Sequence, residues 1–183
     1  MCKLVCRRLW LCAFFLCCLT ARAAQRDVPS FIRPAHRAAL RGFLKAKPHL
    51  RVATFADADE HGKSVLGGVN GGEYGEGKNN SPFYAVGDFN HDGREDFAIA
   101  FVNTRSPKEF PVAIFNGPFR SKRSFQPAFY NEKRFGSYDF LLAIKDDNGR
   151  DELQVSIPGG DWTVMIKPRR RGRGYYVWEG MTE

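Results

Sequence analysis

Cysteine is missing from most of this chain. All five cysteines lie within the first 18 residues, so residues 19–183 contain none. Their absence excludes disulfides, cysteine nucleophiles and cysteine-ligated zinc from that part of the chain. Its stability must therefore come from a hydrophobic core, or from a core together with a bound ion.

Sequence patterns typical of catalysis are also scarce. The chain has no Gly-x-Ser-x-Gly, the motif that carries the nucleophile of many serine hydrolases. Its four histidines are isolated, and none forms the His-x-x-x-His pair of a zinc site. They are His36, His49, His61 and His91. Nothing in these patterns indicates an enzyme.

The first 23 residues have the three parts of a secretory signal peptide. Basic residues Lys3, Arg7 and Arg8 precede the apolar run 9–19, which is followed by Ala21-Arg22-Ala23. This order predicts cleavage after Ala23. The apolar run of 11 residues is shorter than the roughly 20 that span a bilayer. We therefore expect a periplasmic or extracellular protein without a membrane span after cleavage.

Two variants of this export signal have less support. Arg7-Arg8 is the dipeptide of a twin-arginine signal, but paired arginines are common in ordinary signal peptides. Cys17 or Cys18 is a candidate for lipid attachment, but Phe14-Phe15-Leu16 lacks the small residues that such processing prefers.

Residues 24–183 have the length of a single domain with a sizeable core. Removal of the four basic residues Lys3, Arg7, Arg8 and Arg22 lowers the formal net charge from +8 to +4. A balance this mild does not indicate a nucleic-acid partner. We expect a monomer that does not bind nucleic acid.

One amphipathic helix is predicted from Pro34 to Lys47. Alanine, leucine and phenylalanine recur there at three- and four-residue spacing, and basic side chains occupy mainly the other face. Pro34 suits the first turn of a helix, and Pro48 ends it. Residues 51–63 have no assignable pattern, and the glycine-rich segment 67–80 predicts a loop.

Short β-branched and aromatic runs follow Pro82. They cover residues 83–86, 97–102, 112–115, 138–144, 153–157, 162–166 and 175–178, with turn residues between them. The spacing leaves no room for crossover helices and therefore favours antiparallel pairing. The fold class expected is α+β, with the N-terminal helix packed on a meandering antiparallel sheet.

The stretch from Asp88 to Asp96 is the most informative motif. Oxygen-bearing side chains occupy its positions 1, 3, 5 and 9: Asp88, Asn90, Asp92 and Asp96. Gly93 permits a sharp turn that brings the backbone carbonyl of Arg94 toward the same point. Calcium takes six to eight oxygen ligands, and three carboxylates this close repel one another without a cation. The pattern predicts a calcium loop.

This loop departs from an EF-hand, whose position 12 is a bidentate glutamate, because that position is Ile99. Residues 84–102 instead resemble the calcium loops of FG-GAP and VCBS-type repeats, found in integrin-like β-propellers and many secreted bacterial proteins. The resemblance implies that calcium is bound by Asp88, Asn90, Asp92, the Arg94 carbonyl and Asp96. A propeller needs at least four blades, so one good copy is a match to a motif rather than a fold.

Two alternatives concern the acidic turns. Loop 88–96 is also compatible with a polar turn that hydrogen-bonds its own backbone through Asx turns. Residues 146–153 look like a faint second copy, but the first ligand position would fall on Ile144. Asn148-Gly149 between two strand-like runs predicts a β-hairpin.

The function expected is that of an exported, non-enzymatic calcium-binding domain whose partner is another macromolecule, either a protein or a polysaccharide. One alternative is a small secreted hydrolase that uses acidic residues near Tyr130, Glu132, Tyr138 and Asp139. Another is an inhibitor or immunity-type protein of an exported enzyme, with the glycine-rich segment as its binding loop. A basic cluster at Lys167, Arg169, Arg170, Arg171 and Arg173 is interpreted as a solvated turn, with an anionic polymer as the alternative partner.

Overall fold

The computed structural model describes residues 28–68, 82–119, 126–132, 135–137, 139–156, 162–169 and 174–181, and of residues 65–68, 162 and 181 the backbone only. The predicted signal peptide, residues 69–80 of the glycine-rich segment, Tyr138 and Arg170–Arg173 lie outside these ranges. Within them, no helix has the length and apolar character needed to cross a membrane.

Helix α2 (Pro34–Ala46) confirms the helix that the sequence predicts. Its apolar face buries Ala39, Leu40 and Phe43, and the N–H of Lys47 donates to the Phe43 carbonyl at its end. A 3-10 turn, η1 (Phe55–Asp57), and the start of a second helix, α3 (Glu60–Gly68), occupy the segment that the sequence left unassigned. The helix also includes Gly67 and Gly68, which were expected to belong to the loop.

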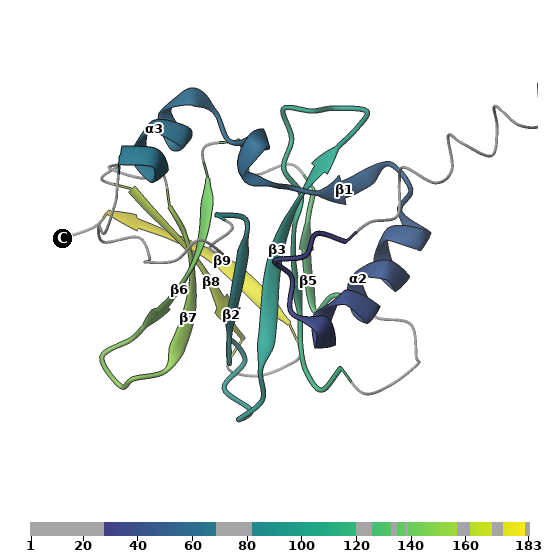
Figure 1. Cartoon of the computed structure of the whole chain (residues 1–183). Coiled ribbons are helices and arrows are strands. Elements are labelled where there is room, and N and C mark those ends of the chain that lie inside the picture. The colour runs from purple at the N-terminus through teal and green to yellow at the C-terminus, as the bar shows by residue number, and fades with distance from the viewer. Residues whose placement is uncertain are drawn as a thin grey trace, which may run out of the picture.

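The first sheet contains five antiparallel strands around β3. These are β1 (Leu50–Val52), β2 (Tyr84–Gly87), β3 (Asp96–Asn103), β4 (Val112–Phe115) and β5 (Phe129–Asn131). Strands β1 and β2 pair with successive parts of one edge of β3, and β4 and β5 follow on its other edge. The turn from β2 to β3 lies at the bottom of Figure 1.

The second sheet is a four-stranded antiparallel meander in the order β6-β7-β8-β9. Its strands are β6 (Phe140–Lys145), β7 (Asp151–Ser156), β8 (Trp162–Pro168) and β9 (Tyr175–Met181). The β-rich, antiparallel character is as predicted, but the expectation of one sheet was wrong. The physical reason is that β3 is apolar on both faces, and a single sheet covered by one helix would leave one of those faces in water.

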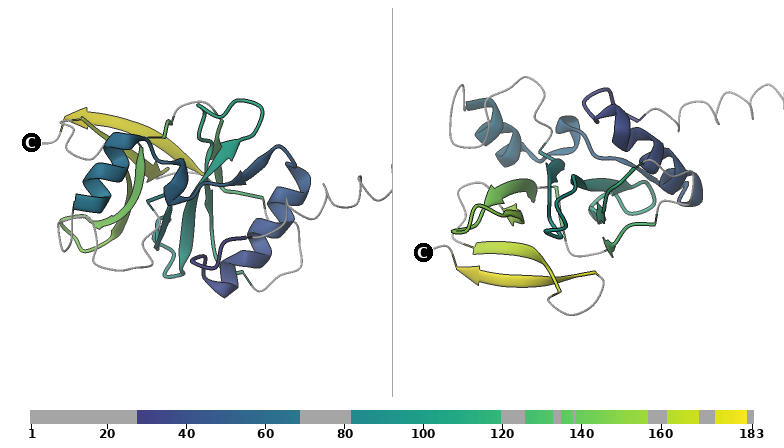
Figure 2. Two further views of the ribbon diagram at one scale, coloured as in Figure 1. Left: turned by 45° about the horizontal axis from the view of Figure 1, so that its top comes forward. Right: turned by 90° about the horizontal axis from the view of Figure 1, so that it is seen from below.

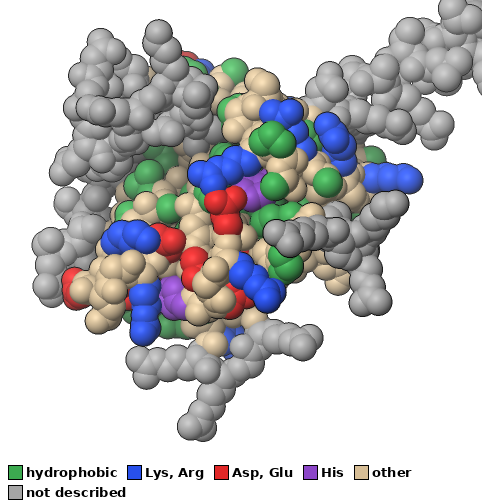
Figure 3. All heavy atoms as spheres, turned by 60° about the horizontal axis from the view of Figure 1, so that its bottom comes forward, with side chains coloured by type: hydrophobic (Ala, Val, Ile, Leu, Met, Phe, Trp, Pro, Cys, Tyr) green, Lys and Arg blue, Asp and Glu red, His purple; other side chains and the backbone are tan. Residues whose placement is uncertain are grey.

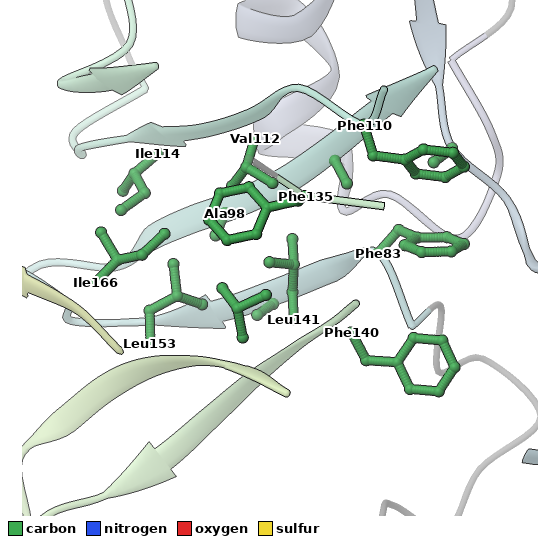
Figure 4. Close-up of a cluster of buried hydrophobic side chains, with 14 of the residues drawn as sticks. Phe83, Ala98, Phe110, Val112, Ile114, Phe135, Phe140, Leu141, Leu153 and Ile166 are labelled. Carbon is green, nitrogen blue, oxygen red and sulfur yellow. The ribbon is translucent and has the colours of Figure 1, made fainter. Parts of the chain in front are cut away.

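Strand β3 lies between helix α2 and the four-stranded sheet (Figures 1 and 2). A hydrophobic cluster packs on each of its faces. Phe97, Ile99 and Phe101 pack with helix α2 on one face of the five-stranded sheet. The intervening Ala98 and Ala100 face the four-stranded sheet. Figure 4 shows this second cluster, in which side chains of β3 and β4 meet those of β6, β7 and β8. The order of layers is therefore helix, five-stranded sheet, four-stranded sheet.

Candidate metal site

The loop between β2 and β3 is held at both ends and sharply curled. Gly87 and Asp96 pair across its base as the last register pair of the two strands. His91 (φ 60°) and Gly93 (φ 80°) both have left-handed backbone conformations. Such a conformation suits glycine but is uncommon for histidine. The His91 side chain compensates through its Nε2, which lies 3.0 Å from the carbonyl oxygen of Asp151.

The side chains of the first half of the loop turn inward onto its own backbone. Asp88 accepts hydrogen bonds from the N–H of Asp92 (3.0 Å) and of Gly93 (2.8 Å). Asn90 Oδ1 also accepts from Asp92 N–H, and Asp92 Oδ1 accepts from Arg94 N–H. The Asx-turn network foreseen as an alternative is therefore present. This network does not occupy every lone pair of the carboxylate oxygens, because an ionised carboxylate offers about four lone-pair sites.

Asp96 is the buried member of the predicted ligand set. Its two oxygens accept the N–H of Asn90 (3.1 Å) and the N–H of Gly117 (2.9 Å). Burial raises the pKa of Asp96 to about 6, the two N–H donors oppose this rise, and the charges of Asp92 and Asp88 add to it. Asp88 and Asp92 therefore repel the charged form of Asp96, a repulsion that a cation would relieve.

Asp151 completes the surroundings of the loop, and the sequence did not identify it as part of the site. It begins β7, and its Oδ2 accepts the N–H of Asp88 at 2.8 Å. Lys145 forms an ion pair with its other oxygen. A Cβ at Gly87 would stand 3.0 Å from the Asp151 Cβ, so the strand and the hairpin approach closely here. Lys145 and the Asp88 N–H hold the pKa of Asp151 below its usual value.

The turn from β6 to β7 is the hairpin that Asn148-Gly149 predicts. Asp146 Oδ1 accepts from the N–H groups of Asn148 and Arg150, both at 2.8 Å, and Gly149 has a φ of 74°. Ile144, the position of the first ligand in a second calcium copy, pairs with Glu152 inside the strands. The hairpin interpretation is confirmed.

The five predicted calcium ligands lie in one loop, but they differ in exposure. Asp96 is buried, Asp88 and Asn90 are half-buried, and Asp92 and Arg94 are exposed. Within the described part of the chain, no three His, Cys, Asp or Glu side chains are gathered as a group that could hold a metal ion. Figure 3 shows acidic and basic side chains interspersed on the face that carries the loop. Calcium ligation here stays a prediction.

A buried histidine connects this loop to helix α2. The His36 side chain is 0% exposed, and its ring stacks on Phe97 at 4.3 Å. Nδ1 lies 2.6 Å from the Tyr84 hydroxyl, and Nε2 lies 3.1 Å from Glu95 Oε1, without hydrogen-bond geometry. Arg33 forms an ion pair with the same carboxylate. Glu95, between two predicted ligands, thereby ties the loop to the helix.

The acidic residues proposed as catalytic groups of a hydrolase each bind different partners within the fold. Glu132 accepts from the Tyr130 hydroxyl (3.1 Å) and pairs with Lys47 (3.2 Å), and these partners lower its pKa. Asp139 accepts from Gly136 N–H, and burial raises its pKa. Tyr138 lies outside the described residues. The contacts found among the described residues do not join Asp139 to Glu132.

The basic cluster is described only at Lys167 and Arg169. Lys167 forms an ion pair with Glu152 at 3.1 Å, and Arg169 Nε donates to the Tyr175 carbonyl. Both basic groups therefore have partners within the fold.

Comparison with known proteins identifies no relative of this chain. No protein-family model, curated protein or solved structure matches this chain. The resemblance of residues 84–102 to FG-GAP and VCBS-type loops therefore stays a prediction from the motif.

A substitution at Gly117 tests the hydrogen bond from its N–H to the buried Asp96. A Cβ at this position would stand 2.5 Å from the backbone oxygen of Glu95, so Gly117→Ala forces the two segments apart. We expect a loss of about 1–3 kcal/mol in the free energy of unfolding, as for other overpacked sites. Urea unfolding measures it. Amide exchange at Asn90, whose N–H donates to Asp96, should accelerate.

Gly149→Ala is the control for this prediction. Position 149 is open, but its φ of 74° makes alanine unfavourable by about 1–2 kcal/mol. It should destabilise the β6–β7 hairpin without faster exchange at Asn90. Equal exchange at Asn90 in both variants would contradict a specific role for Gly117.

Proposed function

We propose that this chain is an exported, non-enzymatic α+β binding domain in which calcium at loop 88–96 stiffens the junction between β2 and β3. The signal-like pattern of residues 1–23 supports export. The observation that carries the calcium proposal is the Asp88 carboxylate, which accepts the N–H of both Asp92 and Gly93. These bonds curl the loop back onto the Asp88 side chain.

Charge supports a cation in this region. Asp88 and Asp92 both repel the charged form of Asp96, which is fully buried. A divalent ion would offset this repulsion, while neutral hydrogen-bond donors offset it only in part. The neighbouring Asp151 is already paired with Lys145, so it adds little uncompensated charge.

The donor set suits calcium better than zinc. The proposed ligands are the side chains of Asp88, Asn90, Asp92 and Asp96 and the carbonyl of Arg94. All are hard oxygen donors, whereas zinc sites take most of their ligands from histidine nitrogen and cysteine sulfur. We expect an ion whose coordination is filled by loop oxygens to stiffen the loop rather than to catalyse a reaction, because it keeps no open position for a substrate. The proposed partner is a macromolecule outside the cytoplasm, and a hydrolase or an inhibitor role gains no supporting contact among the described residues.

Thermal unfolding with and without calcium tests the ion. With calcium at about 100 times its dissociation constant, linkage predicts about 2.7 kcal/mol of added stability. For a domain of this size, the midpoint of unfolding should rise by about 5–10 °C. Excess chelator should abolish the rise, and calorimetry should register binding heat.

Two variants that each remove an Asx-turn side chain sharpen the test. Asp92→Ala removes a proposed ligand that accepts one backbone N–H, and Asp146→Ala removes a side chain of the β6–β7 hairpin that accepts two. Only the first should abolish the calcium response. A parent protein with neither heat nor thermal shift would refute the calcium site, and an equal loss in both variants would assign the effect to turn stability.

A further inference from the structure

Two aromatic side chains are exposed side by side on strand β9. Among the described residues, the large hydrophobic side chains that are exposed are Tyr176 (41%), Trp178 (44%) and Phe55 (47%). Alternate residues of a strand share one face, so Tyr176 and Trp178 project from the same face of the four-stranded sheet. Phe55 belongs to η1, outside this sheet. We call Tyr176 and Trp178 the aromatic pair.

The Trp178 ring lies flat along its own strand. A Cβ at Gly180 would stand 2.1 Å from a carbon of this indole ring, so only glycine leaves room for it. Across the sheet, Trp178 pairs with Met165, which is buried, and Met165 pairs with Gln154. Lys167 Nζ lies 5.4 Å from the centroid of the Trp178 ring. The indole is therefore held in place while nearly half of it remains exposed.

The start of β9 is anchored in the interior. Tyr175 is buried, and its hydroxyl donates to Asn116 Oδ1 at 2.9 Å. The strand is paired with β8 along its whole length, from Tyr175 to Met181. The aromatic pair thus stands on a fixed backbone, and a ligand that stacks on it does not have to order a loop.

We propose that the aromatic pair is a stacking platform for the sugar rings of a neutral polysaccharide. The faces of aromatic rings carry negative charge density, and the C–H groups of a pyranose ring are weakly positive, so the two stack. The inference names the partner class of the proposed function and rests on that function. On the described strand β8 beside the aromatic pair, Lys167 is paired with Glu152 at 3.1 Å, so its charge is already compensated within the fold. We therefore choose a neutral glycan over an anionic one, which would need a free cation at the rings.

A protein partner suits this surface less well. Specific protein interfaces bury about 800 Å² on each side around an apolar centre. Here the aromatic pair is bordered by Lys167, Glu152 and Gln154 on the neighbouring strands. Polar side chains that surround two exposed rings offer hydrogen bonds to the hydroxyl groups of a sugar.

Affinity electrophoresis of the purified protein tests the platform. The probes are gels that contain hydroxyethyl cellulose, laminarin or soluble glycol chitin, with calorimetry on cellohexaose and chitohexaose. We expect at least one probe to slow the parent protein. Trp178→Ala and Tyr176→Ala should each weaken that binding by about tenfold or more, as for the loss of an aromatic anchor.

Gly180→Val keeps both rings but displaces the Trp178 indole from its position over residue 180. It should therefore weaken binding as Trp178→Ala does. Phe55→Ala removes an equally exposed ring elsewhere and should leave binding unchanged. Circular dichroism and the thermal midpoint establish that each variant is folded. No retardation by any of these probes would overturn the platform, and so would unchanged retardation in both Trp178→Ala and Gly180→Val.

The platform and the calcium site can fail independently. Glycan binding that persists in chelator, together with no thermal response to calcium, would refute the calcium site alone. A normal calcium response in a protein that binds none of the glycans would refute the platform alone. Retention of the parent by an immobilised extended peptide, but by none of the glycans, would also overturn it in favour of strand addition at β9.

Discussion

Phe97→Ala should lower the free energy of unfolding by about 3–5 kcal/mol, the usual cost of removing a buried phenylalanine. Phe97 is 0% exposed and lies between two parallel rings, His36 at 4.3 Å and Phe115 at 4.8 Å. Because the three rings come from α2, β3 and β4, the cavity would open between the helix and the sheet. Asp96 precedes it, so loop 88–96 should loosen as well.

Phe55→Ala is the matched control, because the chemical change is the same and Phe55 is 47% exposed. Its effect should stay within about 0.5 kcal/mol. Urea unfolding of both variants and the parent provides the comparison. Similar losses in the two variants would contradict the packing described for Phe97.

Acid should destabilise the protein through His36 by up to about 3 kcal/mol between pH 6.5 and pH 4. Burial lowers the pKa of His36 to about 4; Glu95 opposes this and Arg33 adds to it. In this interval the unfolded chain protonates the imidazole while the folded protein keeps it neutral. The contribution of His36 is therefore fully present above pH 6.5 and is lost as the pH falls toward 4.

Buried carboxyl groups change the free energy of unfolding in the opposite direction over part of this pH interval. Burial raises the pKa of Asp96 to about 6 and also raises that of Asp139. These groups favour the folded state when they are protonated, so their contribution grows as the pH falls from 6. The pH profile of the parent alone is therefore a sum, and His36 must be isolated by difference.

His36→Phe isolates this contribution because it keeps a ring against Phe97 and removes the titrating group. The variant should be less stable at pH 7, since Tyr84 loses its contact with Nδ1. It should nevertheless lose about 3 kcal/mol less than the parent between pH 7 and pH 4. Chemical unfolding in chelator at several pH values measures this difference. Parallel profiles for the two proteins would show that His36 is not the group responsible.

Both experiments probe the junction of helix α2 with the proposed calcium loop. His36 lies against Phe97, and Glu95 lies beside His36 and between Arg94 and Asp96. If Phe97→Ala loosens the loop and so weakens calcium binding, the variant should lose more stability in saturating calcium than in chelator, because calcium then stabilises it less than the parent. The same comparison reports how far the ion site and the core depend on each other.

Local patterns predicted much of the secondary structure. Three- and four-residue spacing predicted a helix over Pro34–Lys47, where the structure has α2 (Pro34–Ala46), and the run 112–115 coincides with β4. Asn148-Gly149 predicted its hairpin because a left-handed turn has a local signature. The short strands β1 and β5 were missed, since three residues carry too little periodicity. Helix α3 was missed because its segment is polar and has glycine at 62, 67 and 68.

The sequence by itself determined the elements whose signals are local: the helix, the strand runs, and a loop of alternating oxygen donors closed by its own Asx turns. Only the tertiary structure decided what surrounds that loop. Asp151, Gly117 and His36 reach it from distant parts of the chain. It also decided that β3 is covered on both faces and that Trp178 lies over Gly180. Such contacts depend on how layers pack, and spacing along one strand or helix does not encode them.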